Sequence, residues 1–279
     1  MELLHRELPQ THTVILAGDL HFGTSACYVK GWEAMLARVK KEKNTYLVLM
    51  GDLLEAIAVD DFRWHSEVHD PKVTPLMQAE ALIEYLYPIR KKILACLTGN
   101  HEQKLWRFGD LTRMICERAE LPFGGYSSKI EITHGGTGLY KIYTIHGRLQ
   151  IGSQADDPLR RLSNHRLSLK RKLQHLAGDC AVMACGHTHR LITVQPESEL
   201  YLTDDGSHIQ AAYTKGVQHG AHIDPNLRWY ANTGSFLKST IVGACTYSET
   251  AMYSPVMMGY PEIACKGGVI QELKETRIG

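Results

Sequence analysis

Residues 14–21 read VILAGDLH, so that four apolar residues lead directly into Gly18, Asp19, Leu20 and His21. A short apolar run of this kind is typical of a strand that is buried on both faces of a sheet. Asp19 and His21 lie two residues apart at its end, so in an extended chain their side chains point the same way. A carboxylate and an imidazole placed together in this manner can contribute to a metal site.

Four further apolar runs end in the same way, each in polar side chains that can bind a metal ion. They are 46–50 before Gly51-Asp52, 93–98 before Gly99-Asn100-His101-Glu102, 142–145 before His146-Gly147, and 181–185 before Gly186-His187-Thr188-His189. If these runs are strands of one sheet, their ends present carboxylate, amide and imidazole groups at the same edge. Such a set of nitrogen and oxygen donors, without a nearby thiolate, favours manganese, iron or zinc over a sulfur-rich structural zinc site.

The segments between these runs have the spacing of amphipathic helices. We expect helices over 30–43, 75–89, 105–119 and 159–176. Alternation of strands and helices is the order of an α/β fold.

Beyond His189 the pattern changes, and the C-terminal third is expected to be mostly β. The predicted strands are 191–194, 199–203, 209–213, 263–266 and 269–273, the last two forming a hairpin around Gly267-Gly268. This part is expected to add a second sheet packed on the first. No linker rich in Pro, Gly or Ser separates it, so we predict a single domain over 1–279, with the motifs in 14–189 and a β-rich part in 190–279.

The composition excludes several classes of protein. The 31 Lys and Arg residues nearly balance the 30 Asp and Glu residues, so no overall charge indicates a nucleic-acid or membrane partner. No apolar run is long enough for a transmembrane helix, and residues 1–10 lack the apolar core of a secretory signal. The seven cysteines include no C-x-x-C pair, so we expect reduced thiols and a cytoplasmic protein. The oligomeric state stays open.

The ordered motifs resemble the signature of the calcineurin-like metallophosphoesterase superfamily, which runs D-x-H, G-D, G-N-H-[DE], H and G-H-x-H. All five blocks occur here in that order, over roughly the first two-thirds of the chain. The resemblance implies an α/β fold in which two sheets form a sandwich flanked by helices, with metals at the strand ends. It also implies two divalent cations, with manganese as the first choice and iron or zinc as alternatives.

The same resemblance implies a role for each residue of the motifs. One cation would be held by Asp19, His21, Asp52 and His189, and the other by Asp52, Asn100, His146 and His187. Asp52 would therefore bridge the two cations. A hydroxide shared by two ions about 3.5–4 Å apart would attack phosphorus in line. His101 would be the catalytic residue that stabilises or protonates the leaving oxygen.

The substrate class is less clearly indicated. Glu102 gives G-N-H-E, as in the protein Ser/Thr phosphatases of the superfamily, but residues 53–56 read LLEA and lack their phosphate-clamping arginine. We therefore prefer a phosphodiesterase acting on a nucleotide or nucleic acid over a phosphoprotein phosphatase. Six Lys and Arg residues in 160–172 favour this choice if they form an anion-binding rim, although a solvated helix face explains them equally well.

Two alternatives remain for the function. One is a phosphomonoesterase acting on a small metabolite. The other, from a different class, is a non-catalytic scaffold with the same fold. Scaffolds of that kind tend to lose ligand residues, whereas every ligand position is present here.

Three local predictions concern the surroundings of the motifs. His134, in Thr133-His134-Gly135-Gly136, competes with His146 for the fourth block, and we prefer His146 because it follows an uninterrupted apolar strand. Asp60, Asp61, His65, His69 and Asp70 could edge the pocket, but we expect them in a surface loop. Residues 247–258, which include Tyr253, could form a cap or a subunit contact, but we expect them to be buried under a loop.

Overall fold

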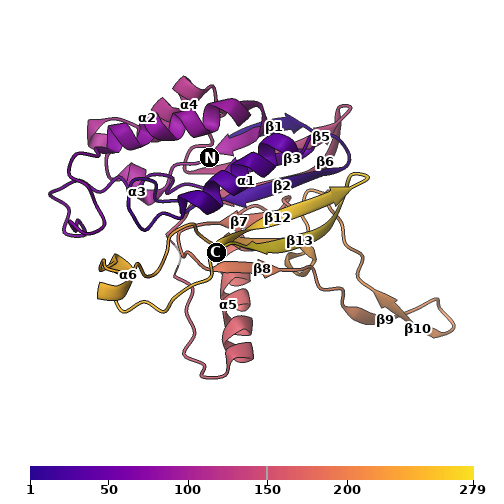
Figure 1. Ribbon diagram of the computed structural model, residues 1–279. Coiled ribbons are helices and arrows are strands. Elements are labelled where there is room, and N and C mark those ends of the chain that lie inside the picture. The colour runs from indigo at the N-terminus through magenta and orange to yellow at the C-terminus, as the bar shows by residue number, and fades with distance from the viewer. Residues whose placement is uncertain (149) are drawn as a thin grey trace.

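The computed structural model describes residues 1–148 and 150–279, and its two large β-sheets lie face to face between layers of helices (Figure 1). The smaller sheet has the strand order β13 (Val269–Arg277), β12 (Gly259–Lys266), β2 (His12–Ala17), β3 (Thr45–Leu49) and β4 (Ile93–Cys96). The larger sheet has the order β1 (Glu2–Glu7), β5 (Ser127–His134), β6 (Thr137–Ile145), β7 (Val182–Cys185), β11 (Trp229–Thr233) and β8 (Leu191–Val194). The expected α/β fold of two sheets flanked by helices is therefore confirmed.

Helices cover the outer faces of both sheets. The smaller sheet is covered by α1 (Val29–Lys41), α2 (Pro75–Leu86) and α4 (Leu111–Ala119), and the larger sheet by α5 (Pro158–Leu173). The first turn of α2 is stabilised by Pro75 and by the Thr74 hydroxyl, which accepts a backbone hydrogen bond. None of the described helices combines the length and the apolar character of a membrane span.

The five motif-bearing strands do not share one sheet, which corrects the expectation drawn from their similarity. Strands β2, β3 and β4 belong to the smaller sheet, whereas β6 and β7 belong to the larger one. All five are buried on both faces, because one face packs against the opposite sheet and the other against helices. A continuous apolar run reports this two-sided burial but not the sheet to which the strand belongs.

The main core lies between the two sheets. Its fully buried members include Val14, Leu16, Val48, Ile142 and Val182. Their sequence neighbours Ile15, Leu47 and Leu49 point to the other face, where they pack with α1 and α2. Each such side chain contributes about 1.5–3 kcal/mol when it is removed from water, so the strand ends rest on a rigid support.

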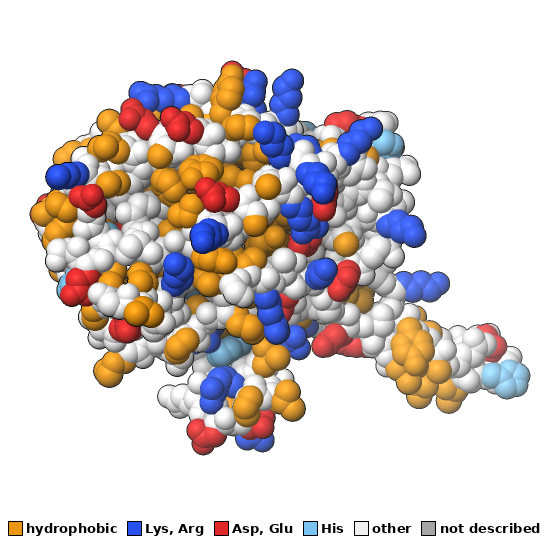
Figure 2. Space-filling model, in the orientation of Figure 1, with side chains coloured by type: hydrophobic (Ala, Val, Ile, Leu, Met, Phe, Trp, Pro, Cys, Tyr) orange, Lys and Arg blue, Asp and Glu red, His pale blue; other side chains and the backbone are white. Residues whose placement is uncertain are grey.

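The C-terminal third is β-rich as expected, but it does not add a second sheet of its own. Strands β8 and β11 extend the larger sheet, while the β12–β13 hairpin joins the smaller sheet by pairing with β2. Gly267 and Gly268 form its turn with φ of 59° and 81°, values that suit glycine. The remaining strands, β9 (Leu200–Asp204) and β10 (Ile209–Tyr213), form a separate arm that projects from the body (Figure 1), and hydrophobic side chains gather on it (Figure 2).

The segment 105–119, predicted as one helix, forms two elements. The segment 105–119 begins with a 3₁₀ turn at Trp106–Phe108, which ends at Gly109 with a φ of 136°. Helix α4 starts only after Asp110, whose side chain accepts a hydrogen bond from the Arg113 backbone N–H. A helix cannot continue through this glycine conformation, so the amphipathic pattern spans two elements.

Candidate metal centre

The loops that follow β2, β3 and β4 lie against one another at one end of the smaller sheet. The backbone N–H of Asp19 donates to the Gly51 carbonyl at 3.0 Å, and that of His21 donates to the Asp52 carbonyl at 3.1 Å. A Cβ atom on Gly99 would lie 2.0 Å from the Asp52 nitrogen, so only glycine allows this approach. The three loops therefore form one compact surface on which polar side chains converge.

The structure brings Asp19, His21 and His189 into a first cluster. Their donor atoms all lie within 4.8 Å of one another. The Nε2 atom of His189 is 3.4 Å from Asp19 Oδ1 and 3.2 Å from His21 Nε2. Since His189 follows β7, this cluster joins the ends of both sheets.

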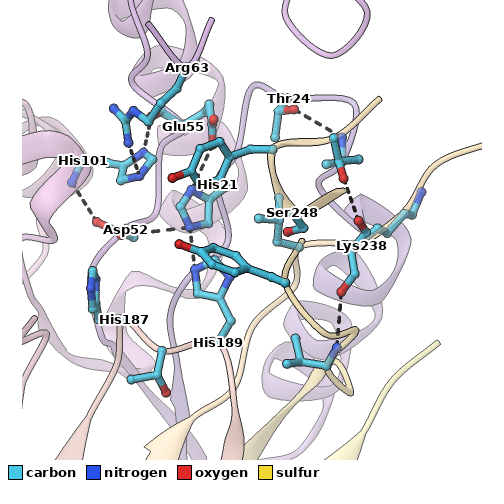
Figure 3. A pocket seen from close by; sticks show the side chains of 18 of the residues that line it. His21, Thr24, Asp52, Glu55, Arg63, His101, His187, His189, Lys238 and Ser248 are labelled. Atoms are coloured by element: carbon cyan, nitrogen blue, oxygen red, sulfur yellow. Dashed lines mark hydrogen bonds and ion pairs between the residues drawn. The ribbon is translucent and has the colours of Figure 1, made fainter. Parts of the chain in front are cut away.

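A second cluster contains Asp52, His146 and His187, whose donor atoms also lie within 4.8 Å of one another. His146 Nε2 is 3.2 Å from Asp52 Oδ2 and 3.1 Å from Asn100 Oδ1. The same Asp52 Oδ2 lies 4.0 Å from His21 Nε2 in the first cluster. All seven predicted ligands are therefore gathered at one place, and Asp52 lies between the two groups. Four of the seven, His21, Asp52, His187 and His189, are labelled in Figure 3.

The chemistry of these donors fits divalent cations. Asp19 and Asp52 are almost fully buried, and within the described chain their ion-pair partners are histidines rather than Lys or Arg. Burial alone lowers the pKa of both His21 and His146, but Glu55 raises that of His21 to about 9 and Asp52 raises that of His146 to about 10. A site that attracts protons so strongly also attracts a divalent cation, which would displace them.

Backbone strain is concentrated at the same residues. In the part of the chain that the structure describes, eight non-glycine residues have positive φ, and five of them are predicted ligands: Asp19, His21, Asp52, His187 and His189. Such a conformation costs on the order of 1–3 kcal/mol for each residue and persists where the surrounding structure imposes it. Here it turns the side chains away from the strand direction and toward a common point.

Two acceptors orient the histidines of the clusters. The Nδ1 atom of His21 donates to Glu55 Oε2 at 2.9 Å, and that of His146 donates to the Met50 carbonyl at 2.9 Å. Each hydrogen bond keeps one proton on Nδ1, so that Nε2 can offer its lone pair to a cation once its own proton is displaced. Glu55 was not among the predicted site residues, because its role depends on a contact with His21 across 34 positions.

Glu55 also contacts His69, at 3.1 Å between Oε1 and Nε2. Burial opposes ionisation of Glu55, but the hydrogen bonds from His21 and His69 outweigh it and hold the pKa of this carboxyl well below its usual value. His69 is 8% exposed and lines the pocket. The expectation that residues 60–70 form only a surface loop is therefore wrong for His69.

His101 is placed beside the clusters rather than within them. Its backbone N–H donates to Asp52 Oδ1 at 2.9 Å, and its Nδ1 donates to the Glu55 carbonyl at 2.6 Å. Burial lowers the pKa of His101 to about 4, against the charge of Asp52, so the ring is neutral near pH 7. Its Nε2 atom lies 3.1 Å from Nη1 of Arg63.

Arg63 is a pocket residue that sequence reasoning missed. Its Nε and Nη2 atoms donate to the two carboxylate oxygens of Asp61 at 3.0 and 2.7 Å, which fixes the guanidinium with Nη1 directed at His101. No motif or strand end marks this position. Among the features of the sequence, only the short spacing between Asp61 and Arg63 could have suggested the ion pair.

Other motif residues support the loops instead of the clusters. Glu102 accepts backbone hydrogen bonds from Leu53 at 2.7 Å, from Leu54 at 2.9 Å and from Gly99 at 2.9 Å. It therefore joins the loop after β3 to the short helix α3 (Asn100–Gln103). His134 lies at the β5–β6 turn, where its Nδ1 donates to the Leu8 carbonyl, far along the sheet from His146.

A cavity of about 630 Å³ opens onto both clusters (Figure 3). Its inner wall carries His21, Asp52, Asn100, His101, His187 and His189. Its outer wall comes from the segment between β11 and β12, which includes α6 (Tyr247–Thr250). Tyr247 and Tyr253 are 49% and 61% exposed, so the expectation that this segment is buried under a loop is wrong.

Comparison with known proteins agrees with this arrangement. A model of the calcineurin-like phosphoesterase family matches residues 12–191, which contain all five motifs. No curated protein matches the sequence.

Several solved structures are similar to this chain. Vps29 from Chaetomium thermophilum has 14% identity and a TM-score of 0.37, with 95% of this chain and 96% of that chain covered. A metallophosphoesterase from Sphaerobacter thermophilus has 12% identity and a TM-score of 0.42, with 96% and 88% covered. A 5'-nucleotidase precursor from Thermus thermophilus has 13% identity and a TM-score of 0.45, with 96% of this chain and 54% of that chain covered.

Proposed function

This chain belongs to the calcineurin-like phosphoesterase family and is a hydrolase acting on phosphoester bonds, and we propose that it is a dinuclear phosphodiesterase for a nucleotide or nucleic acid. The observation that supports a dinuclear centre is the position of Asp52 between two donor clusters at the floor of one cavity. We assign Asp19, His21, Asp52 and His189 to one cation and Asp52, Asn100, His146 and His187 to the other. Manganese is the metal we propose first, because oxygen and imidazole donors are combined here.

Two bound cations would supply Lewis-acid stabilisation of the phosphoryl oxygens and an activated water. The protein holds the two carboxylates and the imidazoles in place without a substrate, through Glu55, Met50 and the strained backbone described above. Preorganisation of this kind lowers the cost of reaching the transition state.

Arg63 and His101 lie where the substrate's phosphoryl group would meet the protein. The Arg63 guanidinium, fixed by Asp61, offers Nη1 as a donor to a phosphoryl oxygen. A clamping arginine is therefore supplied from outside the second motif, where sequence reasoning found none. His101 can stabilise or protonate the leaving oxygen only when Nε2 carries a proton. Burial and the nearby Arg63 charge lower the pKa of the ring in the protein without substrate, so we propose that the negative phosphoryl group raises this pKa when the substrate binds.

Helix α5 favours a nucleotide or nucleic-acid substrate. Its six Lys and Arg residues have no Asp or Glu on the same helix, and none of them forms an ion pair among the described residues. The charges of Arg161 in α5 and of Arg190 in the pocket both act on the buried His165. We propose that the charges of α5 attract a polyanionic substrate toward the cavity.

The proposal is tested by hydrolysis of bis-p-nitrophenyl phosphate with added Mn²⁺ and by metal analysis. We expect Asp52→Asn to lower kcat/KM at least about 100-fold and to reduce the bound metal, while Asp60→Asn, on an exposed loop carboxylate, has no effect. Full activity in Asp52→Asn would show that the bridging assignment is wrong. Faster turnover of p-nitrophenyl phosphate than of the diester would favour the phosphomonoesterase alternative.

A further inference from the structure

The outer wall of the cavity is a firmly attached cap, here defined as residues 237–256. Lys238 N–H donates to the Ala26 carbonyl at 2.9 Å, and Cys245 N–H donates to Glu67 Oε2 at 2.6 Å. Within the cap, the Thr246 hydroxyl donates to the Ser239 carbonyl at 2.6 Å. The cap is therefore bonded to the body at two separate loops, and it can position side chains opposite the metal centre.

Two tyrosines are the aromatic residues that the cap presents to the cavity. The rings of Tyr247 and Tyr253 lie 6.0 Å apart between centroids at an angle of 81°, so they make a corner and not a stack. The Tyr253 backbone N–H donates to the Ser248 carbonyl at 2.9 Å, which fixes the spacing of the two rings. Both rings are about half exposed, and an aromatic face left open in a cavity is available for stacking.

The charged and hydroxyl groups that line the cavity indicate what kind of ligand it can hold. The acids that line it are Asp52 and Glu55, and both belong to the inner wall. The lining cations are Arg63, which lies beside His101, together with Arg190 and Lys238. The cap adds the hydroxyl groups of Ser239, Ser248 and Ser254. A ligand that fits has an anionic group at one end and a flat aromatic group with polar edges at the other.

We infer that the corner of Tyr247 and Tyr253 is a base-binding subsite, which stacks on the nucleobase of a nucleotide ester whose phosphate lies at the donor clusters. This inference rests on the proposed function, because it names the part of the substrate that the cap recognises. The cavity volume of about 630 Å³ falls within the range of small-molecule sites. Stacking on any base is sequence-tolerant, so the subsite selects nucleotides as a class.

The test compares two diesters with the same leaving group in the Mn²⁺-loaded enzyme: the p-nitrophenyl ester of thymidine 5'-monophosphate and methyl p-nitrophenyl phosphate. We expect Tyr253→Ala and Tyr247→Ala to raise KM for the thymidine ester about 10-fold and to leave the methyl ester unchanged. Tyr253→Phe keeps the ring and should retain activity on both esters. Tyr213→Ala, on the projecting arm, is the matched control.

The outcomes separate the inference from the proposed function. Equal losses on both esters, or no loss on the thymidine ester, would overturn the base-binding subsite while leaving the phosphodiesterase intact. If the wild type hydrolyses neither ester, the proposed function fails. Calorimetric binding of thymidine 5'-monophosphate then decides the inference: weaker binding in Tyr253→Ala supports it, and unchanged or absent binding in the wild type overturns it.

Discussion

At the scale of single residues, Glu55 contacts three histidines of the site. Its carboxylate orients His21 and His69, and its backbone carbonyl orients His101. One residue thus sets the tautomer of a predicted ligand and of the predicted catalytic histidine. Both effects act through hydrogen bonds, so they can be separated by substitutions that keep the size of the side chain.

We predict that Glu55→Gln lowers the affinity for Mn²⁺ by about 10- to 100-fold, because His21 loses the carboxylate that fixes its tautomer. Titration of the metal-free protein with Mn²⁺, followed by calorimetry, measures this change. Glu117→Gln, on the exposed face of α4, serves as the control and should leave the affinity unaltered. An unchanged affinity in Glu55→Gln would contradict the positioning role.

Arg63 leads to a second prediction at this scale. We expect Arg63→Ala to reduce kcat on a diester by about 100-fold, since a preorganised donor to the phosphoryl group is lost. Asp61→Asn should produce part of the same loss, because the carboxylate holds the guanidinium in place. Steady-state kinetics measures these losses, and Arg107→Ala, at an exposed arginine, is the control. If all three variants behaved alike, the assignment of Arg63 would be wrong.

At the scale of elements, the loops at the strand ends are constrained by close backbone contact. A Cβ atom on Gly99 would lie 2.0 Å from the nitrogen and 2.1 Å from Oδ1 of Asp52. We predict that Gly99→Ala destabilises the protein by about 2–3 kcal/mol, because the loop before α3 must shift. Urea unfolding measures the difference. Gly216→Ala, where a Cβ meets open space, should change stability by less than about 0.5 kcal/mol.

Asp179, which precedes β7, links two interior strands of the larger sheet. Its carboxylate accepts from Lys129 in β5 at 2.7 Å and from Lys141 in β6 at 2.9 Å. Burial raises the pKa of Asp179, but the two lysines outweigh it and lower the pKa to about 2. Because the folded-state pKa is below the usual 3.8, this stabilisation is present above about pH 4 and is lost as the pH falls toward 2.

We therefore predict that Asp179→Asn lowers the free energy of unfolding by about 1 kcal/mol at pH 7, with a difference that shrinks below pH 4. Urea unfolding of both proteins at pH 7 and pH 3 tests this. Asp60→Asn, without a lysine partner among the described residues, should show no such dependence. A constant difference across this pH range would argue against the ion pairs.

At the scale of the whole molecule, the first and last parts of the chain share one sheet. Strand β12 pairs with β2, so the C-terminal hairpin completes the sheet that carries the first three motifs. The chain also crosses between the two sheets more than once. We propose on this basis that residues 1–279 form a single domain.

A single domain predicts one cooperative transition in urea, seen at the same midpoint by circular dichroism and by tryptophan fluorescence. Deletion of residues 259–279 should abolish this transition rather than lower its midpoint, because β2 then becomes an unpaired edge. Two transitions, or a truncated protein that folds, would show that the parts are independent.

Much of this molecule was predictable from short stretches of sequence. The apolar runs identified β2, β3, β4, β6 and β7, and the polar residues at their ends are the ones that the structure gathers. Such features are local: they depend on burial and on the residue that follows a strand.

Only the tertiary structure decided the division of these strands between two sheets, since a run buried on both faces looks the same in either. It also decided the places of Glu55, Arg63 and the cap, whose contacts join residues that are far apart in the chain. A side chain that acts through such a contact leaves no periodic or spaced pattern in the sequence. The predicted ligands were therefore readable from the motifs, whereas the groups that orient them and shape the cavity emerged only when the chain was folded.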